Sequence, residues 1–153
     1  MANPFILVLD GIEDPHNFGA ILRTAECAGV TEVIIRKVRQ VQVTETVVKV
    51  STGAANIVKI RKVPNIAEAI RALQNDGVTV VGLESSGSIE YTKADLNLPL
   101  ALVIGSEGKG ISHLVKERCD YLVNIPLKGK ITSLNASVAA GIAMFEVVRQ
   151  RMV

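Results

Sequence analysis

Three loops of this 153-residue sequence carry polar residues whose types and spacing could do chemistry. Each loop follows an apolar run that we predict to be a strand, and ligands of open α/β sheets bind beyond the carboxyl ends of strands. Carboxylate, amide, hydroxyl and guanidinium groups can orient a ligand, accept a proton or stabilise a developing charge. The candidate residues are Asn17, Arg23, Glu107, Ser133 and Asn135.

The first loop spans residues 10–23 and leads into a predicted helix. Asn17 stands where we expect the N-cap of that helix, and capping alone would justify an asparagine there. Arg23 follows six residues later, about 240° around the helix, at or beyond the margin of the apolar stripe. A plain surface role therefore remains an alternative for Arg23.

The second loop, Ile104–Gly110, is rich in glycine but does not have the spacing of a phosphate-binding loop. It matches neither GxxxxGK[ST] nor GxGxxG, because its glycines run GxxGxG. Glu107 in its middle would also repel a phosphate. A ligand with positive charge and no phosphate, such as S-adenosylmethionine (SAM) with its sulfonium, suits this loop better.

The third loop, residues 125–135, enters a long helix that is rich in alanine and glycine. Ser133 and Asn135 are natural capping residues for its first turn. Leu134, Val138, Ile142 and Phe145 recur at helical spacing, and core packing would account for that stripe. Packing does not explain the two polar residues before the helix.

Apolar runs of strand type alternate with helical patterns along the chain, which predicts an α/β fold with a parallel sheet and helices on both faces. Residues 44–50 are ambiguous between a strand and a short helix. The predicted strands are 5–9, 32–35, 57–63, 78–83, 100–104 and 121–125, and the predicted helices are 18–28, 67–73, 112–118 and 135–149.

Composition indicates one ordered domain over residues 1–153, with no run of about 18 apolar residues that could span a membrane. The two cysteines are far apart in the sequence, and the amino terminus lacks the features of a signal peptide, so we expect a reduced, cytoplasmic protein. No cluster of metal-binding residues is evident.

A basic segment lies between Arg36 and Lys62, where seven basic residues and one acid give a charge of +6. Such a segment suits the phosphate backbone of a nucleic acid, although a solvated surface would explain it as well. Aromatic residues make up only 3%, so base stacking is poorly supplied. The residues that we expect to contact RNA are Arg36, Lys37, Arg39, Lys109 and Lys128.

Taken together, the three loops resemble the motifs of the SpoU (TrmH) family of the SPOUT methyltransferases. Residues 17–23 look like its first motif, 102–110 its second and 125–144 its third, in the same order and over nearly the whole chain. Residues 44–55, with Ser51-Thr52-Gly53-Ala54, resemble the branch that methylates guanosine in 23S ribosomal RNA.

The resemblance implies an α/β SPOUT fold with a deep trefoil knot at its carboxyl end, and a homodimer in which the last helix forms much of the interface. Members of the family often carry an RNA-binding domain before this one; here the first strand begins at Phe5, so we expect that domain to be absent. SAM would be bound in the knot by Leu83, Ile104, Gly105, Gly108, Ile125, Leu127 and Leu134.

The implied activity is SAM-dependent methyl transfer to a ribose 2′-hydroxyl of RNA, without a metal. Because a guanidinium stays protonated, Arg23 would stabilise developing alkoxide charge, while a phosphate oxygen, water or Glu107 takes the proton. Ser133 and Asn135 would orient the ribose or the Glu107 loop. The target is expected to be 23S ribosomal RNA, with transfer RNA as the alternative.

Two other classes of function are alternatives. One is a non-catalytic RNA-binding or ribosome-assembly protein that retains the cofactor pocket, but such a protein has little need for the full set of candidate catalytic residues. The other is a Rossmann-type dehydrogenase, which the glycine spacing and the absence of a dinucleotide fingerprint after the first strand disfavour.

Overall fold

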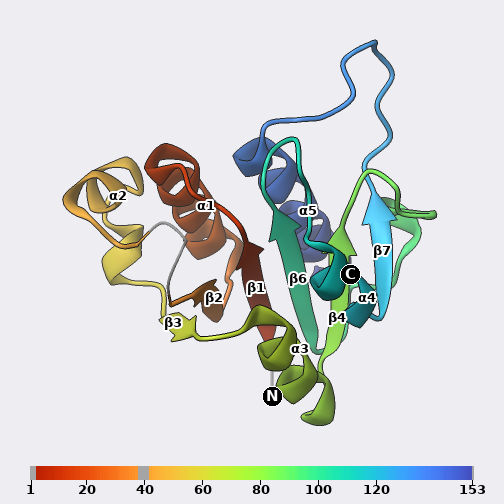
Figure 1. Cartoon of the computed structure of the whole chain (residues 1–153), viewed down its shortest axis with the longest axis horizontal. Helices are drawn as coiled ribbons and strands as arrows, with labels where there is room; N and C mark the ends of the chain where they lie inside the picture. Colours follow the sequence, from red (N-terminus) through yellow and green to blue (C-terminus); the bar gives the residue numbers. More distant parts are fainter. Residues whose placement is uncertain (1–2, 38–41, 153) are drawn as a thin grey trace.

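The computed structural model describes residues 3–37 and 42–152, and its centre is a seven-stranded parallel sheet (Figure 1). Every strand pairing in it is parallel, in the order β3-β2-β1-β6-β4-β7-β5. This agrees with the predicted fold class. The strands are β1 (Phe5–Asp10), β2 (Glu32–Arg36), β3 (Ile60–Val63), β4 (Thr79–Leu83), β5 (Ile89–Glu90), β6 (Leu100–Gly105) and β7 (Tyr121–Asn124).

Helices cover both faces of the sheet, as the alternation of strands and helices predicts. One face packs against α1 (Pro15–Ala28), α2 (Glu45–Val50) and α5 (Ala136–Arg151), and the other against α3 (Ile66–Asn75) and α4 (His113–Arg118). The sequence of strand β1 is apolar because side chains on both of its faces are buried. Phe5, Leu7 and Leu9 enter the first core, whereas Ile6 and Val8 enter the second.

Helix α1 begins earlier than the sequence suggested, which changes the role of Asn17. Asp14 is the N-cap, and its carboxylate accepts a hydrogen bond from the backbone N–H of His16 at 2.9 Å. Pro15 occupies the first turn, where its missing N–H costs nothing. The prediction that Asn17 caps this helix was therefore wrong, and its side chain is available for other contacts.

Some elements were left ambiguous by the sequence, differ from the predicted boundaries or were not predicted. The ambiguous segment 44–50 forms the helix α2 from Glu45 onward, and Thr44 caps it by accepting from the N–H of Val47. The strand expected from residue 57 starts only at Ile60, since Ile57 ends a short 3₁₀ helix, η1 (Ala54–Asn56), by donating to the carbonyl of Ala54. The two-residue strand β5 and the 3₁₀ helix η2 (Tyr91–Lys93) were not predicted.

Helix α5 buries the face opposite to the one that we expected. Three of its buried residues are alanines, and the helix approaches α1 closely: a Cβ at Gly141 would lie 3.6 Å from the side chain of Thr24. Val138 and Phe145 of the predicted core stripe are instead 50% and 46% exposed. Core packing therefore does not explain that stripe.

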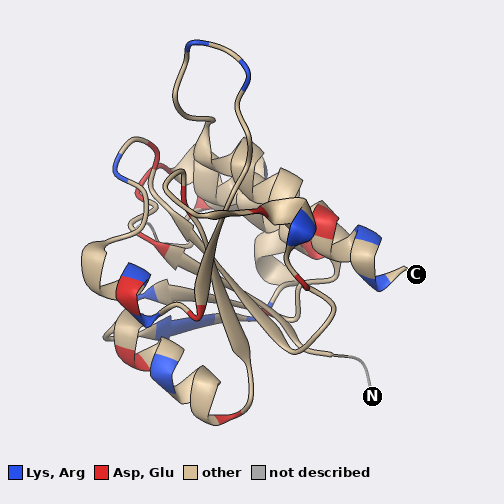
Figure 2. Cartoon of the chain, turned by 90° about the vertical axis from the view of Figure 1, so that its right-hand side faces the viewer, with Lys and Arg blue, Asp and Glu red and all other residues tan. Residues whose placement is uncertain are grey.

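The segment between β7 and α5, residues 125–135, stands out from the body of the molecule (Figures 1 and 2). We call it the projecting loop. Its only charged residues are Lys128 and Lys130, and both are exposed. Within residues 3–37 and 42–152, no helix is both long and apolar enough to cross a bilayer.

Candidate functional site

Asn135, at the end of the third candidate loop, contacts the other two loops through its side-chain amide. Its Nδ2 donates to the Oδ1 of Asn17 at 3.1 Å and to the Oε2 of Glu107 at 3.2 Å. These residues are 118 and 28 positions from Asn135 in the sequence. The fold thus brings one residue from each candidate motif into a single hydrogen-bonded set, which we call the amide–carboxylate set.

The orientation of Asn135 is fixed by its position at the start of α5. As the N-cap, its Oδ1 accepts from the backbone N–H of Ser137 at 2.9 Å and of Val138 at 3.4 Å. With the oxygen directed at the helix, the Nδ2 must point away from it, toward Glu107 and Asn17. Capping and the contacts within the set are therefore satisfied by opposite ends of the same amide.

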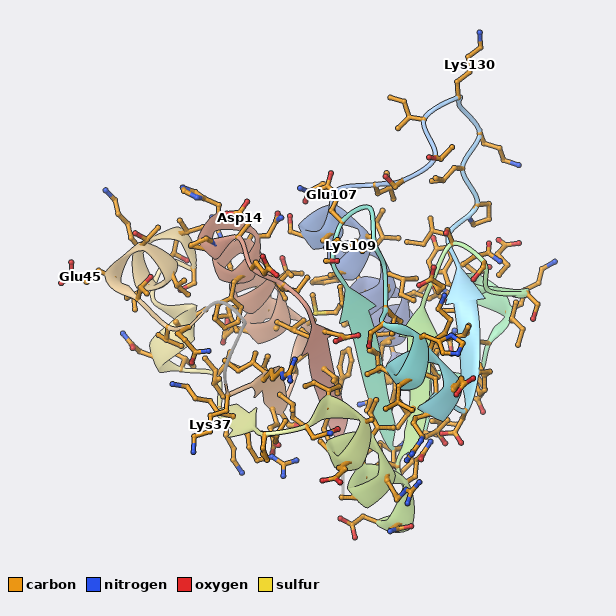
Figure 3. The ribbon with its side chains drawn as sticks, viewed as in Figure 1. Asp14, Lys37, Glu45, Glu107, Lys109 and Lys130 are labelled. Carbon is orange, nitrogen blue, oxygen red and sulfur yellow. The ribbon has the colours of Figure 1, made fainter. Side chains whose placement is uncertain are left out.

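Glu107 lies at the turn of the glycine-rich loop after β6, and it points to the same side as Lys109 and Asp14 in Figure 3. The loop is a tight one: the N–H of Gly110 donates to the carbonyl of Ser106 at 2.8 Å, and Gly108 and Gly110 have positive φ angles. A side chain at Gly105 would collide with the backbone of Gly110. Glycine is required here for backbone conformation and close approach.

A pocket lies between the glycine-rich loop, the residues after β4 and the two stems of the projecting loop. We call it the glycine-loop pocket. All of the residues that we expected to bind a cofactor line it, namely Leu83, Ile104, Gly105, Gly108, Ile125, Leu127 and Leu134. Glu84, Ser85, Ser106, Glu107, Thr132 and Ser133 supply its polar atoms, and none of its lining residues is Lys or Arg.

A second pocket, which we call the β1-loop pocket, lies on the other side of Glu107. It is more polar, and its lining includes Gly11, Glu13, Asp14, Asn17 and Lys109. The two pockets share Ser106, Glu107 and Ala136. Two ligands bound in them would therefore meet at the amide–carboxylate set.

Arg23 and Ser133 are not members of that set. Ser133 is exposed on the projecting loop and lines the glycine-loop pocket, but the cap of α5 is Asn135. Arg23 is exposed on α1, about 9 Å further along the helix axis than Asn17. It lines neither pocket, and the described part of the chain offers its side chain no hydrogen bond or ion pair.

The basic residues are dispersed over the molecule. Lys109 and the projecting loop are near the two pockets, whereas Lys37 points away from them (Figure 3). Arg36 and Lys37 are exposed, and Arg39 lies outside the described residues. The basic segment is also less positive than its sequence indicated, because Lys59 and Arg61 form ion pairs with Glu32 at 3.4 and 2.6 Å.

Sequence reasoning missed Glu84, which lines the glycine-loop pocket directly after β4. Its position after a strand was a usable signal, since the other candidate loops were found in that way. Glu13 and Asp14 were also missed as lining residues of the β1-loop pocket. Among the described residues, no group of three or more His, Cys, Asp or Glu side chains is placed to hold a metal ion.

Comparison with known proteins gives consistent matches. The sequence model of the SpoU rRNA Methylase family matches residues 4–145. A protein of Staphylococcus saprophyticus named for the TrmH family of tRNA/rRNA methyltransferases is 52% identical over 146 residues, and YacO of Bacillus subtilis, named for the same family, is 51% identical over 148. The matched residues are 95% and 97% of this chain and 59% of each relative.

The fold is also similar to that of a solved structure. The SpoU methyltransferase AviRb from Streptomyces viridochromogenes, in complex with the cofactor AdoMet, superposes with a TM-score of 0.92 at 29% sequence identity. The superposition covers 99% of this chain and 62% of AviRb. This chain therefore spans about three fifths of the length of these similar proteins.

Proposed function

This chain belongs to the SpoU rRNA Methylase family, and we propose that it transfers a methyl group from SAM to a ribose 2′-hydroxyl of RNA. The observation that carries the proposal is the amide–carboxylate set, which stands where the two pockets meet. Methyl transfer needs the acceptor oxygen and the donor sulfur aligned on opposite sides of the methyl carbon. Two pockets that share Glu107 suit that requirement.

The glycine-loop pocket is the proposed cofactor site. Its apolar residues, among them Leu83, Ile104 and Leu134, suit the adenine ring, and its glycines allow close backbone contact. Two carboxylates and no lining cation suit a positively charged ligand rather than a phosphate. Bound there, SAM would supply an activated methyl group: an oxygen nucleophile would bond to the methyl carbon as the carbon–sulfur bond breaks, and the sulfur would leave as a neutral thioether.

The β1-loop pocket is the proposed acceptor site, and Glu107 is the group that we propose receives the hydroxyl proton. Its Oε2 is held by Asn135, and among the described residues its Oε1 has no hydrogen-bond partner. Asn135 also holds Asn17, whose remaining amide hydrogens can orient the ribose. Asn135 itself acts as the positioning residue, because both of its amide hydrogens are already donated.

We further propose that two copies of the chain form a homodimer through α5. Val138 and Phe145 form an exposed apolar stripe with the half-buried Ile142, at the spacing of one helix face. A second copy of the same face would cover it symmetrically. Arg23 lies on α1, which packs beside α5. Near such an interface, it would reach a phosphate or the developing alkoxide of the partner's acceptor site.

The RNA would approach over the edge that carries Lys109 and the projecting loop with Lys128, with Arg36 and Lys37 as more distant contacts. We retain 23S ribosomal RNA as the proposed target, with transfer RNA as the alternative. The deep trefoil knot also remains a proposal. Its crossing segments would be the glycine-rich loop and the projecting loop, which together enclose the glycine-loop pocket.

The test is incubation of this chain with methyl-labelled SAM and unmodified transcripts of ribosomal and transfer RNA. We expect label in RNA, and at the labelled nucleotide a phosphodiester bond that resists alkaline hydrolysis, because a 2′-O-methyl group removes the hydroxyl that attacks the phosphate. Label on a base would refute the ribose assignment. SAM binding without any incorporation would favour the non-catalytic class for this chain.

A further inference from the structure

Glu84 is a carboxylate in the glycine-loop pocket that the proposed reaction does not use. It directly follows β4, and its side chain is only 10% exposed. Burial of a carboxylate is costly unless it has partners. Glu84 has few: its Oε2 accepts from the N–H of Ile111 at 3.1 Å, and its Oε1 lies 3.9 Å from the Nζ of Lys116, which is too far for a hydrogen bond.

The surroundings of Glu84 leave its charge incompletely balanced. Lys116 is on α4 and does not line the pocket, whereas Glu84 and Glu107 both do. No other lining residue carries a charge. The wall of the pocket therefore presents two negative charges, with Lys116 behind one of them as a partial counterion.

This charge distribution distinguishes the two forms of the proposed cofactor. SAM has a positive sulfonium, and S-adenosylhomocysteine, the product of methyl transfer, has a neutral thioether at the same place. Their adenosine, ammonium and carboxylate groups are the same. A negative pocket wall stabilises the first form and does nothing for the sulfur of the second.

On the proposed function, we infer that Glu84 selects the cationic methyl donor over its neutral product, so that the spent cofactor is released and replaced. Glu84 can do this without touching the reacting atoms, because the interaction is between charges and acts over several ångströms. The hydrogen bond from the N–H of Ile111 fixes the Glu84 carboxylate beside Gly110. A Cβ added at Gly110 would lie 2.7 Å from the Oε2 of Glu84. The carboxylate is thereby held at the pocket wall rather than turned to solvent.

The test compares the dissociation constants of SAM and S-adenosylhomocysteine by isothermal titration calorimetry, for this chain and for Glu84→Gln. Glutamine keeps the acceptor for Ile111 and removes the charge. We expect the preference for SAM to fall about five- to tenfold, as for the loss of one charge–charge interaction across a partly solvated site. Affinity for S-adenosylhomocysteine should change little, which also reports that the pocket is intact.

Two further variants test whether the effect depends on charge at the pocket wall. Lys116→Gln removes the counterion, so it should raise the preference for SAM, opposite in sign to Glu84→Gln. Glu68→Gln on α3 changes the net charge by the same amount at an exposed position outside both pockets, and it should leave the preference unchanged. Sinefungin, which has a protonated amine in place of the methylated sulfur, should follow SAM in all variants.

An unchanged preference in Glu84→Gln, with SAM still bound, would overturn this inference and leave the proposed function intact. An equal change in Glu68→Gln would also overturn it, because the effect would then come from net charge. If the unaltered chain bound neither SAM nor S-adenosylhomocysteine, the cofactor proposal itself would fall, and this inference with it.

Discussion

Replacing Asn135 by aspartate separates the two roles of this residue. The Oδ1 that caps α5 is kept, since aspartate and asparagine cap helices about equally well. The Nδ2 that donates to Asn17 and Glu107 becomes a second carboxylate oxygen. Two hydrogen bonds, each contributing about 0.5–1.5 kcal/mol, are lost, and a negative charge is placed about 3 Å from the Glu107 carboxylate.

The expected result is a large loss of turnover in a protein that still folds. Repulsion should turn Glu107 away from the junction of the two pockets, and a displacement of about 1 Å in a reacting group costs about 100-fold in rate. We expect kcat to fall about 10²- to 10³-fold. The free energy of unfolding should fall by about 1–3 kcal/mol from the two lost hydrogen bonds, because the favourable new charge at the helix N-terminus offsets much of the repulsion at this exposed site.

The assay is methyl transfer to RNA at saturating SAM, with the affinity for SAM and the urea midpoint measured on the same preparations. Asn65→Asp is the matched control. Asn65 caps α3 by accepting from the N–H of Glu68 at 3.0 Å, on the opposite face of the sheet. It should retain normal turnover. A kcat within about threefold of the unaltered chain for Asn135→Asp would refute the positioning role of Asn135.

Three further outcomes are expected. Phe145→Ser on the exposed stripe of α5 should convert a dimer into a monomer in sedimentation analysis. Ile57 is 70% exposed and lies outside that stripe, so Ile57→Ser should leave the dimer intact. A monomeric parent chain would contradict the dimer proposal. Replacing both lysines of the projecting loop by glutamine should weaken RNA binding and reduce the magnitude of the slope of log K against log salt by about 1.4 to 1.8, with SAM affinity unchanged; an unchanged slope would exclude phosphate contacts by these lysines. Burial, with smaller contributions from nearby carboxylates, raises the pKa of the Cys119 thiol to about 12, so at pH 8 a thiol reagent should modify exposed Cys27 and spare Cys119 until urea unfolds the chain; equal rates would contradict that burial.

Several residues of the candidate site could be predicted from the sequence because their signals are local. Apolar runs mark the strands, and the polar residues that follow β1 and β6 must reach one edge of a parallel sheet. Gly105, Gly108 and Gly110 indicate a tight loop, because residues without a side chain allow close backbone approach and positive φ angles. These features were enough to name the three members of the amide–carboxylate set. The residues expected to bind the cofactor, which line the glycine-loop pocket, came from the family resemblance, and Glu84 was missed.

Other features depended on contacts that no local pattern contains. Asn17 looked like a cap until Asp14 and Pro15 proved to begin α1, and only then was its side chain free to meet Asn135. Lys59 and Arg61 looked like part of a free basic segment, but Glu32 on the adjacent strand pairs with both. A partner contributed by another element changes the role of a residue without any change in its own neighbourhood along the chain.

The amino-acid sequence by itself determined the α/β alternation, the three loops and the polar residues in them, because strand and helix periodicity and turn chemistry act over a few residues. The tertiary structure alone decided which face of α5 is buried and what the amide of Asn135 contacts. The stripe with Phe145 is apolar enough for a core, yet close packing of the small residues near Gly141 against α1 turns it outward. The burial of a helix face depends on what packs against it, and that is a property of the whole fold.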